Sequence, residues 1–344
     1  MRLKIPKDYK PKLNFTETEK AIHEIKNFFQ KNIAQDLNLI RATSPLFIRA
    51  KTGINDDLNG IEKPVSFSVK SDGNSVAEIV QSLAKWKRMA LHRYGLEVGE
   101  GIYTDMNAIR PDEELDNLHS LYVDQWDWEK VIQKDQRNLD YLKNTVRKIY
   151  RVLKETETFI CNKYKNISPI LPDEIYFIHS EGLEKMYPDL TPKEREVEIC
   201  KKEKAVFVIG IGANLESGKP HDGRAADYDD WTTPTHNGFK GLNGDIIFWN
   251  PILECEFEIS SMGIRVDPEA LKKQLKIKNQ VEKEKLLFHK KLLNNELPLC
   301  IGGGIGQSRI CMFFLRKAHI GEVQCSIWSD EMLDVCRKNN IDIL

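Results

Sequence analysis

Paired cysteines are missing from this sequence. The seven cysteines of the 344-residue chain are scattered, and no two of them stand in a CxxC spacing. Neither a zinc site nor a redox motif is therefore indicated. An odd number of cysteines in a chain of this size favours reduced thiols, which predicts a cytoplasmic protein.

An excess of charge, a long apolar run and a signal peptide are also absent. Lys and Arg number 51 against 52 Asp and Glu, so nothing favours wholesale binding to nucleic acid or to an acidic membrane surface. No apolar run approaches the roughly 18 residues of a membrane span, and residues 1–6 turn polar at once. Repeats and flexible linkers are missing too, so we expect a soluble protein, without a membrane partner, that forms a single domain over residues 1–344.

Hydrophobic residues make up 41% of the chain, which suffices for a full globular core. A helix is predicted to begin at Thr16, where Thr16 and Glu19 match a capping box, and its apolar stripe is Ile22, Ile25, Phe29 and Ile33. Further helices are predicted within 128–165, within 268–295 and, as the last element, over 306–317. Alternating or apolar runs predict strands at 39–40, 64–70, 75–80, 101–110, 119–129, 174–179, 205–211, 245–249 and 252–260. Hairpin-joined strands with helices clustered elsewhere predict an α+β fold with an antiparallel sheet rather than a Rossmann sheet.

In the hairpin over 101–129, one face of the second strand begins with apolar residues and finishes with polar ones. The period of two sends Leu121, Val123, Gln125 and Asp127 to the same face, which resembles a pocket floor with polar anchors. Arg110 stands at the mouth of this hairpin, where it can grip a phosphate or a carboxylate with two parallel hydrogen bonds. The alternative is a surface hairpin whose arginine is merely solvated.

Glycines precede the predicted helix over 306–317. Residues 302–306 read Gly-Gly-Gly-Ile-Gly, which allows close backbone approach at a helix N-terminus that favours anions. The run is neither a dinucleotide fingerprint nor a phosphate-binding Walker loop. Arg309 stands in the first helical turn, where a cation opposes the helix dipole unless it faces a bound phosphate. The alternative is a tight turn followed by a helix cap.

Carboxylates are concentrated on the strand over 252–260. Glu254, Glu256, Glu258 and Ser260 share one face, with Asp245 on the preceding strand. Clustered carboxylates beside a nucleotide hold Mg²⁺ through oxygen ligands. The alternative, a solvated polar face on a half-buried strand, suits Glu254 best.

Taken in order, these segments resemble the three motifs of class II aminoacyl-tRNA synthetases. The capped helix and the strand that ends near Pro45 resemble motif 1, a dimer element; Arg110 with its loop and strand resembles motif 2; the glycines with Arg309 resemble motif 3. Each match is weak alone, but the order of all three is specific. The resemblance implies an antiparallel sheet flanked by helices.

Several strings narrow the resemblance to the ammonia-type asparagine synthetases, the asparagine synthetase A family. They cover most of the chain from about residue 17 to 330 and lie at 55–60, 82–88, 122–129, 221–231, 241–245 and 260–265. One departure is Gln81, where the family pattern predicts histidine. The family implies a homodimer that makes asparagine from aspartate, ammonia and ATP through a β-aspartyl-adenylate and releases AMP and pyrophosphate, with Mg²⁺ as cofactor.

The resemblance and the chemistry of the side chains together assign roles. Arg110 and Arg309 neutralise phosphate charge during adenylation. Asp56, in a predicted loop over residues 53–60 that can close over the site, binds and deprotonates ammonium. The alternative for Asp56 is an ordinary turn aspartate. Arg265 binds the α-carboxylate of aspartate with two parallel hydrogen bonds, while Asp127 and Gln125 accept hydrogen bonds from its α-ammonium. The full aspartate-binding set is Ser82, Lys87, Gln125, Asp127, Ser260, Ser261 and Arg265. The ATP-binding set is Arg110, Leu118, His119, Ser120, Val123, Asp229, Asp245, Glu258, Gly304 and Arg309, of which Asp245 and Glu258 are the predicted Mg²⁺ ligands.

Three other functions are less well supported. A tRNA-charging enzyme needs an anticodon-binding module and a basic face, yet the motifs leave no spare domain and the net charge is −1, so no tRNA partner is expected. A glutamine-dependent synthetase of the N-terminal-nucleophile type needs cysteine at position 2, which is Arg2 here. A non-catalytic relative would have lost Arg110, Arg309 or the acidic strand, and all are present.

Overall fold

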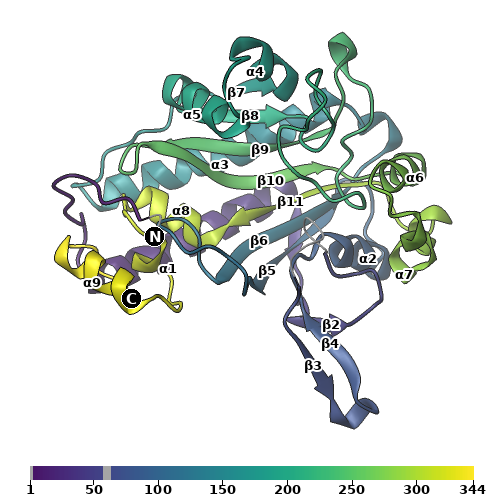
Figure 1. The fold of residues 1–344 in the computed structure, drawn as a ribbon, viewed down its shortest axis with the longest axis horizontal. Helices are drawn as coiled ribbons and strands as arrows, with labels where there is room; N and C mark the ends of the chain where they lie inside the picture. The colour runs from purple at the N-terminus through teal and green to yellow at the C-terminus, as the bar shows by residue number, and fades with distance from the viewer. Residues whose placement is uncertain (1–2, 57–62) are drawn as a thin grey trace.

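The computed structural model describes residues 3–56 and 63–344. Its centre is an eight-stranded sheet of order β1-β5-β6-β11-β10-β9-β8-β7 (Figure 1). The five inner pairings are antiparallel, whereas the edge pairs β1–β5 and β7–β8 are parallel. The strands are β1 (Leu39–Arg41), β5 (Gly101–Ile109), β6 (Tyr122–Val131), β7 (Tyr176–His179), β8 (Ala205–Ile209), β9 (Asn243–Asn250), β10 (Cys255–Ile264) and β11 (Cys300–Gly306). The predicted α+β fold is confirmed.

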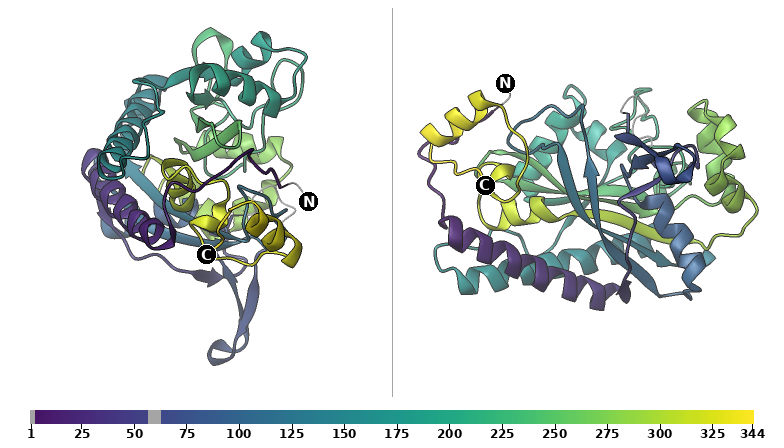
Figure 2. Two further views of the ribbon diagram at one scale, coloured as in Figure 1. Left: turned by 90° about the vertical axis from the view of Figure 1, so that its left-hand side faces the viewer. Right: turned by 90° about the horizontal axis from the view of Figure 1, so that it is seen from below.

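Two long helices, α1 (Phe15–Leu37) and α3 (Leu139–Lys163), lie side by side along one face of this sheet (Figure 2). Of the predicted stripe of α1, Ile25, Phe29 and Ile33 are buried there and Ile22 is half-buried. The ring of Phe29 packs on Trp126 of β6 with centroids 4.7 Å apart. Because side chains alternate along a strand, Gln125 and Asp127 point to the opposite face of the sheet. One face therefore carries the core and the other carries polar chemistry.

Shorter helices surround the sheet, and a small arm projects from it. The helices are α2 (Ala84–Tyr94), α4 (Ser180–Met186), α5 (Pro192–Glu203), α6 (Pro268–Ile277), α7 (Leu287–Leu293), α8 (Gln307–Phe314) and α9 (Asp330–Lys338). The arm consists of β2 (Phe47–Arg49), β4 (Ser75–Ile79) and β3 (Ser66–Val69), in that order across its sheet, and extends away from the body in Figure 1. Within the described ranges, no helix is both long and apolar enough to cross a membrane.

The predicted helix boundaries need correction. The capping box of α1 is formed by Asn14 and Glu17, not by Thr16 and Glu19, since Asn14 Oδ1 accepts the N–H of Glu17 and Glu17 Oε2 accepts that of Asn14, each at 3.0 Å. The helix predicted from residue 128 begins only at Leu139, because residues 128–131 complete β6 and pair with β11. Helix α9 follows α8, so the helix predicted over 306–317 is not the last element.

A β-bulge changes which residues of β10 share a face. The register shifts between Glu258 and Ser260, so that Glu258 lies opposite Ile247 and Ser261 lies opposite Asp245. Since Asp245 and Ile247 are two residues apart, Glu258 and Ser261 share their face. The prediction that Ser260 shares a face with Glu258 is therefore wrong. Glu254 precedes the strand in a turn with φ of 48°.

Candidate active site

The glycines that precede α8 form a trough in the polar face of the sheet. Gly302, Gly304 and Gly306 belong to strand β11, which the sequence did not predict, and pair with Glu129, Asp127 and Gln125 of β6. A Cβ atom at Gly304 would overlap Oε1 of Gln125 and lie 2.9 Å from its Cδ. The absence of side chains on β11 therefore makes room for the polar side chains of β6.

Two adjoining pockets open along this trough. The first has a volume of about 300 Å³ and is lined by Arg110, Glu113, Leu118, His119, Ser120, Tyr122, Val123, Asp124, Gln125, Glu258, Ile259, Ser260, Gly304, Gly306, Arg309, Ile320 and Gln324. The second has a volume of about 270 Å³ and is lined by Asp56, Gln81, Ser82, Ala84, Arg110, Gln125, Asp127, Arg224, Tyr228, Asp229, Glu258, Ser261, Arg265, Gly303 and Gly304. Arg110, Gln125, Glu258 and Gly304 line both, so the two pockets share a wall.

Most of the predicted site residues line one of these pockets. Lys87 and Asp245 are the exceptions among them, and two others sit apart from their predicted partners: Ser260, assigned to aspartate, lines the first pocket, and Asp229, assigned to ATP, lines the second. The fold thus brings together segments that are more than 250 residues apart in sequence, from Asp56 to Arg309.

Buried polar atoms without partners are concentrated in these walls. Nε2 and Oε1 of Gln81, Nε of Arg110 and Oδ2 of Asp127 are buried and have no hydrogen-bond partner among the residues that the structure describes. Buried polar groups are normally satisfied, so a pocket that gathers unsatisfied ones is suited to a polar ligand.

Among the described residues, each of the two arginines of the first pocket donates a hydrogen bond from only one nitrogen of its guanidinium group. Nη2 of Arg110 donates to the backbone oxygen of Gln81 at 3.3 Å, and Nη1 of Arg309 donates to the backbone oxygen of Glu258 at 2.9 Å. The guanidinium of Arg309 also lies 5.7 Å from the centre of the Phe257 ring. Their remaining donors face a space lined by both residues, which suits an anionic ligand.

The N-terminus of α8 does not offer a free anion site. Asp124 of β6 caps it, because its Oδ1 accepts the N–H of Ser308 at 3.0 Å and its Oδ2 accepts the hydroxyl of Ser308 at 2.8 Å. The anion expected at this helix end is thus a carboxylate of the protein, and Arg309 is the contribution of α8 to the pocket.

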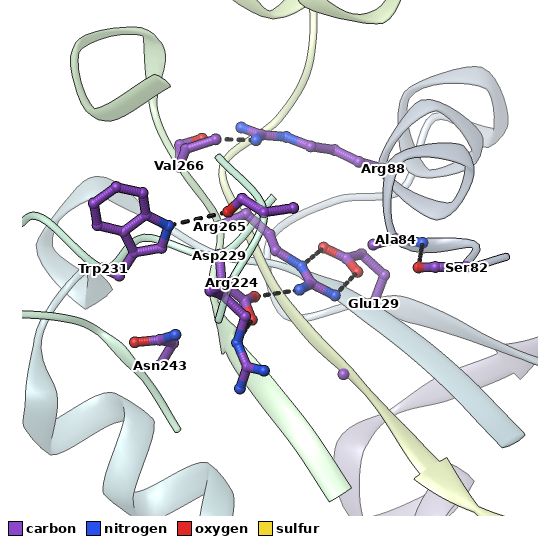
Figure 3. Close-up of polar contacts among 12 residues, drawn as sticks. Ser82, Ala84, Arg88, Glu129, Arg224, Asp229, Trp231, Asn243, Arg265 and Val266 are labelled. Carbon is purple, nitrogen blue, oxygen red and sulfur yellow. Dashed lines mark hydrogen bonds and ion pairs between the residues drawn. The ribbon is translucent and has the colours of Figure 1, made fainter. Parts of the chain in front are cut away.

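Arg265 lies in a buried network of carboxylates (Figure 3). Its Nε and Nη2 each donate to Glu129 at 2.8 Å, and its Nη1 donates to Asp229. Burial lowers the pKa of Arg265, but the two carboxylates outweigh that effect and hold its pKa well above the usual value. Three of its N–H donors are engaged, and a guanidinium has five, so two remain for a ligand in the second pocket.

Lys87 lies beneath the trough rather than in a pocket wall. It is fully buried, and its Nζ donates to Oδ1 of Asp127, to the backbone oxygen of Trp128 at 3.0 Å and to that of Gly303 at 3.2 Å. Because Lys87 engages one oxygen of Asp127, the other oxygen is left for the second pocket. Lys87 therefore orients Asp127 in the structure.

Asp245 is paired with Arg224 and lies near Glu258. Burial raises the pKa of Asp245 to about 7; Arg224 opposes this rise, and the charge of Glu258 adds to it. Nε of Arg224 also lies 3.5 Å from Oδ2 of Asp229, so Arg224 pairs with a second carboxylate, one that lines the second pocket (Figure 3). Among residues 3–56 and 63–344, no cluster of three or more Asp, Glu, His or Cys is arranged to hold a metal ion, so a cation here has at most two such ligands.

Asp56 reaches the second pocket from the segment before residue 57. It is 3% exposed, and its charge, together with burial, raises the pKa of Tyr228 in the same pocket well above the usual value. Oδ1 of Asn55 accepts the N–H of Asp56 at 3.1 Å and thereby fixes its backbone. The rest of the predicted loop, residues 57–60, lies outside the described residues.

Several lining residues were missed by sequence reasoning. Arg224 and Tyr228 fall inside the matching string at 221–231, so a cation among the acidic residues of that string was a usable signal. Gln324 joins the first pocket through hydrogen bonds to Asp124 at 3.3 Å and Ser308 at 3.1 Å, and no local pattern marks it.

An antiparallel sheet with an arginine from the β5–β6 hairpin and another after β11 defines the catalytic core of class II aminoacyl-tRNA synthetases. The chain is similar in fold to the asparaginyl-tRNA synthetase of Entamoeba histolytica, with a TM-score of 0.65 and 14% identity over 91% of this chain and 69% of that chain. It is likewise similar to the Pyrococcus horikoshii asparaginyl-tRNA synthetase complexed with asparaginyl-adenylate, with a TM-score of 0.66 and 14% identity over 89% and 68% of the two chains.

Sequence similarity identifies the family within this class. Residues 16–340 match the family model described as aspartate-ammonia ligase. The chain is 59% identical to the aspartate–ammonia ligase of Clostridium perfringens over 100% of this chain and 99% of that protein, and 58% identical to that of Bacteroides fragilis over 98% of each. The chain therefore belongs to the aspartate–ammonia ligase family, as the matching strings predicted.

Proposed function

We propose that this chain makes asparagine from aspartate, ammonia and ATP in its two adjoining pockets and releases AMP and pyrophosphate. The observation that best supports this proposal is the wall that the two pockets share, since both are lined by Arg110, Gln125, Glu258 and Gly304. Adenylation requires a carboxylate in one site to attack the α-phosphate in the other, and two pockets with a common wall hold the reactants next to each other.

The second pocket is the proposed aspartate site. Arg265 keeps two donors for the α-carboxylate, and the unpaired oxygen of Asp127 with the amide of Gln125 accepts hydrogen bonds from the α-ammonium. Ser82 and Ser261 line the same pocket. The β-carboxylate then extends toward Arg110 at the shared wall, where it attacks the α-phosphate.

The first pocket is the proposed ATP site. Its lining includes Leu118, His119, Ser120, Val123, Ser260, Gly304 and Arg309. Arg110 stabilises the charge that develops on the α-phosphate, and Arg309 binds farther along the triphosphate. Asp229, from the second pocket, completes the predicted set.

Asp245 and Glu258 are the proposed ligands of Mg²⁺. Their mutual repulsion contributes to the raised pKa of Asp245, which is the electrostatic condition that a cation relieves. When bound, the ion neutralises phosphate charge. Arg224 supplies positive charge to Asp245 and Asp229 from the protein itself.

Asp56 is the proposed base for the second half-reaction. Ammonia circulates as ammonium at neutral pH, so a carboxylate is needed to bind and deprotonate it. Asp56 lies in the aspartate pocket together with Arg110, at the end where the adenylate forms. This placement is consistent with ammonia reaching the acyl carbon from the side of Asp56.

A homodimer built on motif 1 is supported by exposed apolar surface. β1 is an edge strand whose Ile40 is 56% exposed. The arm exposes Phe47, Phe67 and Val76, and Leu46 just before it is also exposed. Such surface is normally covered in an assembly. Light scattering at micromolar concentration is expected to give twice the monomer mass, and a monomer would contradict the proposed dimer. We also propose one catalytic domain, a cytoplasmic location, consistent with seven unpaired cysteines, and no need for tRNA.

The proposed reaction is tested by incubating the protein with aspartate, ammonium, ATP and Mg²⁺ without tRNA. AMP and asparagine are expected in equal amounts. ADP in place of AMP, or AMP without asparagine, would refute the proposal.

A further inference from the structure

Gln81 is buried in the wall of the proposed aspartate pocket, yet its amide has no partner. The side chain is 1% exposed, and neither Nε2 nor Oε1 has a hydrogen bond among the described residues. A buried, unpaired amide costs free energy, so one that lines a pocket is normally satisfied by the ligand. No role was assigned to this residue from the sequence, where it replaces the expected histidine.

The backbone of Gln81 is tied to two residues of the proposed reaction. Oδ1 of Asn55 accepts the N–H of Gln81 at 2.9 Å and that of Asp56 at 3.1 Å, so Gln81 and Asp56 are anchored to one oxygen atom. Nη2 of Arg110 donates to the backbone oxygen of Gln81 at 3.3 Å. Gln81 thus lies between Arg110 and Asp56, at the reacting end of the pocket.

We propose that Gln81 contacts the incoming ammonia and forms its binding subsite together with Asp56. This inference rests on the proposed function. Oε1 of Gln81 accepts an N–H of the ammonium, which has only donors to offer, and Asp56 accepts a second. A neutral amide supplies this acceptor without itself changing charge.

In the amination step, the nitrogen loses two protons and one bond of the adenylate breaks. Ammonium gives one proton to Asp56, and the lone pair of ammonia forms the C–N bond at the acyl carbon. The bond between that carbon and the phosphate oxygen breaks, and its electron pair leaves with AMP. The nitrogen releases a second proton to water, which leaves the amide of asparagine. Gln81 exchanges no proton; it orients the nitrogen.

The test replaces Gln81 by methionine, which has a similar length but no amide. The KM for ammonium in Gln81→Met is expected to rise by about 10-fold or more, because a hydrogen bond to a charged group is lost. The aspartate KM in the aspartate-dependent exchange of pyrophosphate into ATP should stay unchanged. Gln81→His, assayed at pH 8 where imidazole is neutral, should recover most of the ammonium affinity.

Gln274 provides a matched control, because it is a buried glutamine whose amide is fully engaged. Its Nε2 donates to the backbone oxygens of Ala226 and Asp229, each at 2.9 Å, and its Oε1 accepts the N–H of Trp231 at 2.9 Å. Gln274→Met is therefore expected to lower the midpoint of thermal unfolding, whereas Gln81→Met should leave it unchanged or raise it.

The outcomes separate the inference from the proposed function. Wild-type protein that forms no AMP and asparagine would refute the proposed function before any variant is compared. If the wild type is active but Gln81→Met raises the aspartate KM and not the ammonium KM, the amide binds aspartate and the inference is overturned. An unchanged KM for both substrates, or a loss of stability like that of Gln274→Met, would overturn it as well.

Discussion

Substituting Gly304 by alanine tests whether the trough in β11 is a binding feature. The new Cβ would overlap the end of the Gln125 side chain and lie 3.4 Å from Oδ1 of Asp127, and Gly304 lines both pockets. Gln125 can rotate away at a cost of about 0.5–1.5 kcal/mol, so the protein should fold. The displaced amide then loses its hydrogen bond to the α-ammonium of aspartate, which costs about 1.5–3 kcal/mol.

That loss corresponds to a rise of about 10- to 100-fold in the KM for aspartate, measured in initial-rate assays. Gly303→Ala is the matched control on the other face of the same strand, where a Cβ would lie 2.5 Å from Cβ of Met262 and 2.7 Å from the backbone oxygen of Ser261. The backbone has less freedom to move, so this variant should lose about 1–3 kcal/mol of stability in urea unfolding. An unchanged aspartate KM in Gly304→Ala would refute the reasoning about the trough.

Three further predictions follow from single side chains. Asp56→Asn should slow asparagine formation by about 10²- to 10⁴-fold while aspartate-dependent pyrophosphate exchange persists; an equal loss of both would assign Asp56 to adenylation or to pocket closure. Glu258→Gln should raise the Mg²⁺ concentration needed for half-maximal adenylation, and an unchanged Mg²⁺ titration would exclude it as a ligand. Burial lowers the pKa of His319 to about 4. Its contribution to the free energy of unfolding is therefore fully present above pH 6.5, the usual pKa of histidine, and about 3 kcal/mol is lost as the pH falls to 4. His319→Gln should remove this part of the pH dependence, measured by urea unfolding.

The sequence identified most of the residues that line the two pockets, but it misjudged details of the strands that build them. The period of two correctly placed Gln125 and Asp127 on one face of β6, because the strand is regular. The same rule misplaced Ser260, since a bulge between Glu258 and Ser260 adds one residue to β10 and no sequence signal marks it. No strand was predicted over residues 302–306, because glycine disfavours strands, yet the polar side chains of β6 occupy the space that the glycines leave.

Long-range contacts account for the remaining differences. Lys87 was expected to touch aspartate, but the strands above it enclose its Nζ, which contacts the pocket lining through Asp127 and Gly303. Arg265 was predicted to bind the α-carboxylate of aspartate, and in the structure it also pairs with the carboxylates of Glu129 and Asp229. Such pairings join residues more than 30 positions apart and leave no local pattern from which they can be inferred.

The fate of an oxygen atom tests the central claim most directly. If the β-carboxylate of aspartate attacks the α-phosphate across the shared wall at Arg110, one of its oxygens stays with the phosphate when ammonia displaces AMP. Aspartate labelled with oxygen-18 in its β-carboxylate is therefore expected to give AMP that carries one labelled oxygen, detected by mass spectrometry. Unlabelled AMP, with the displaced labelled oxygen in pyrophosphate, free phosphate or water, would contradict the adenylate and the two-pocket account.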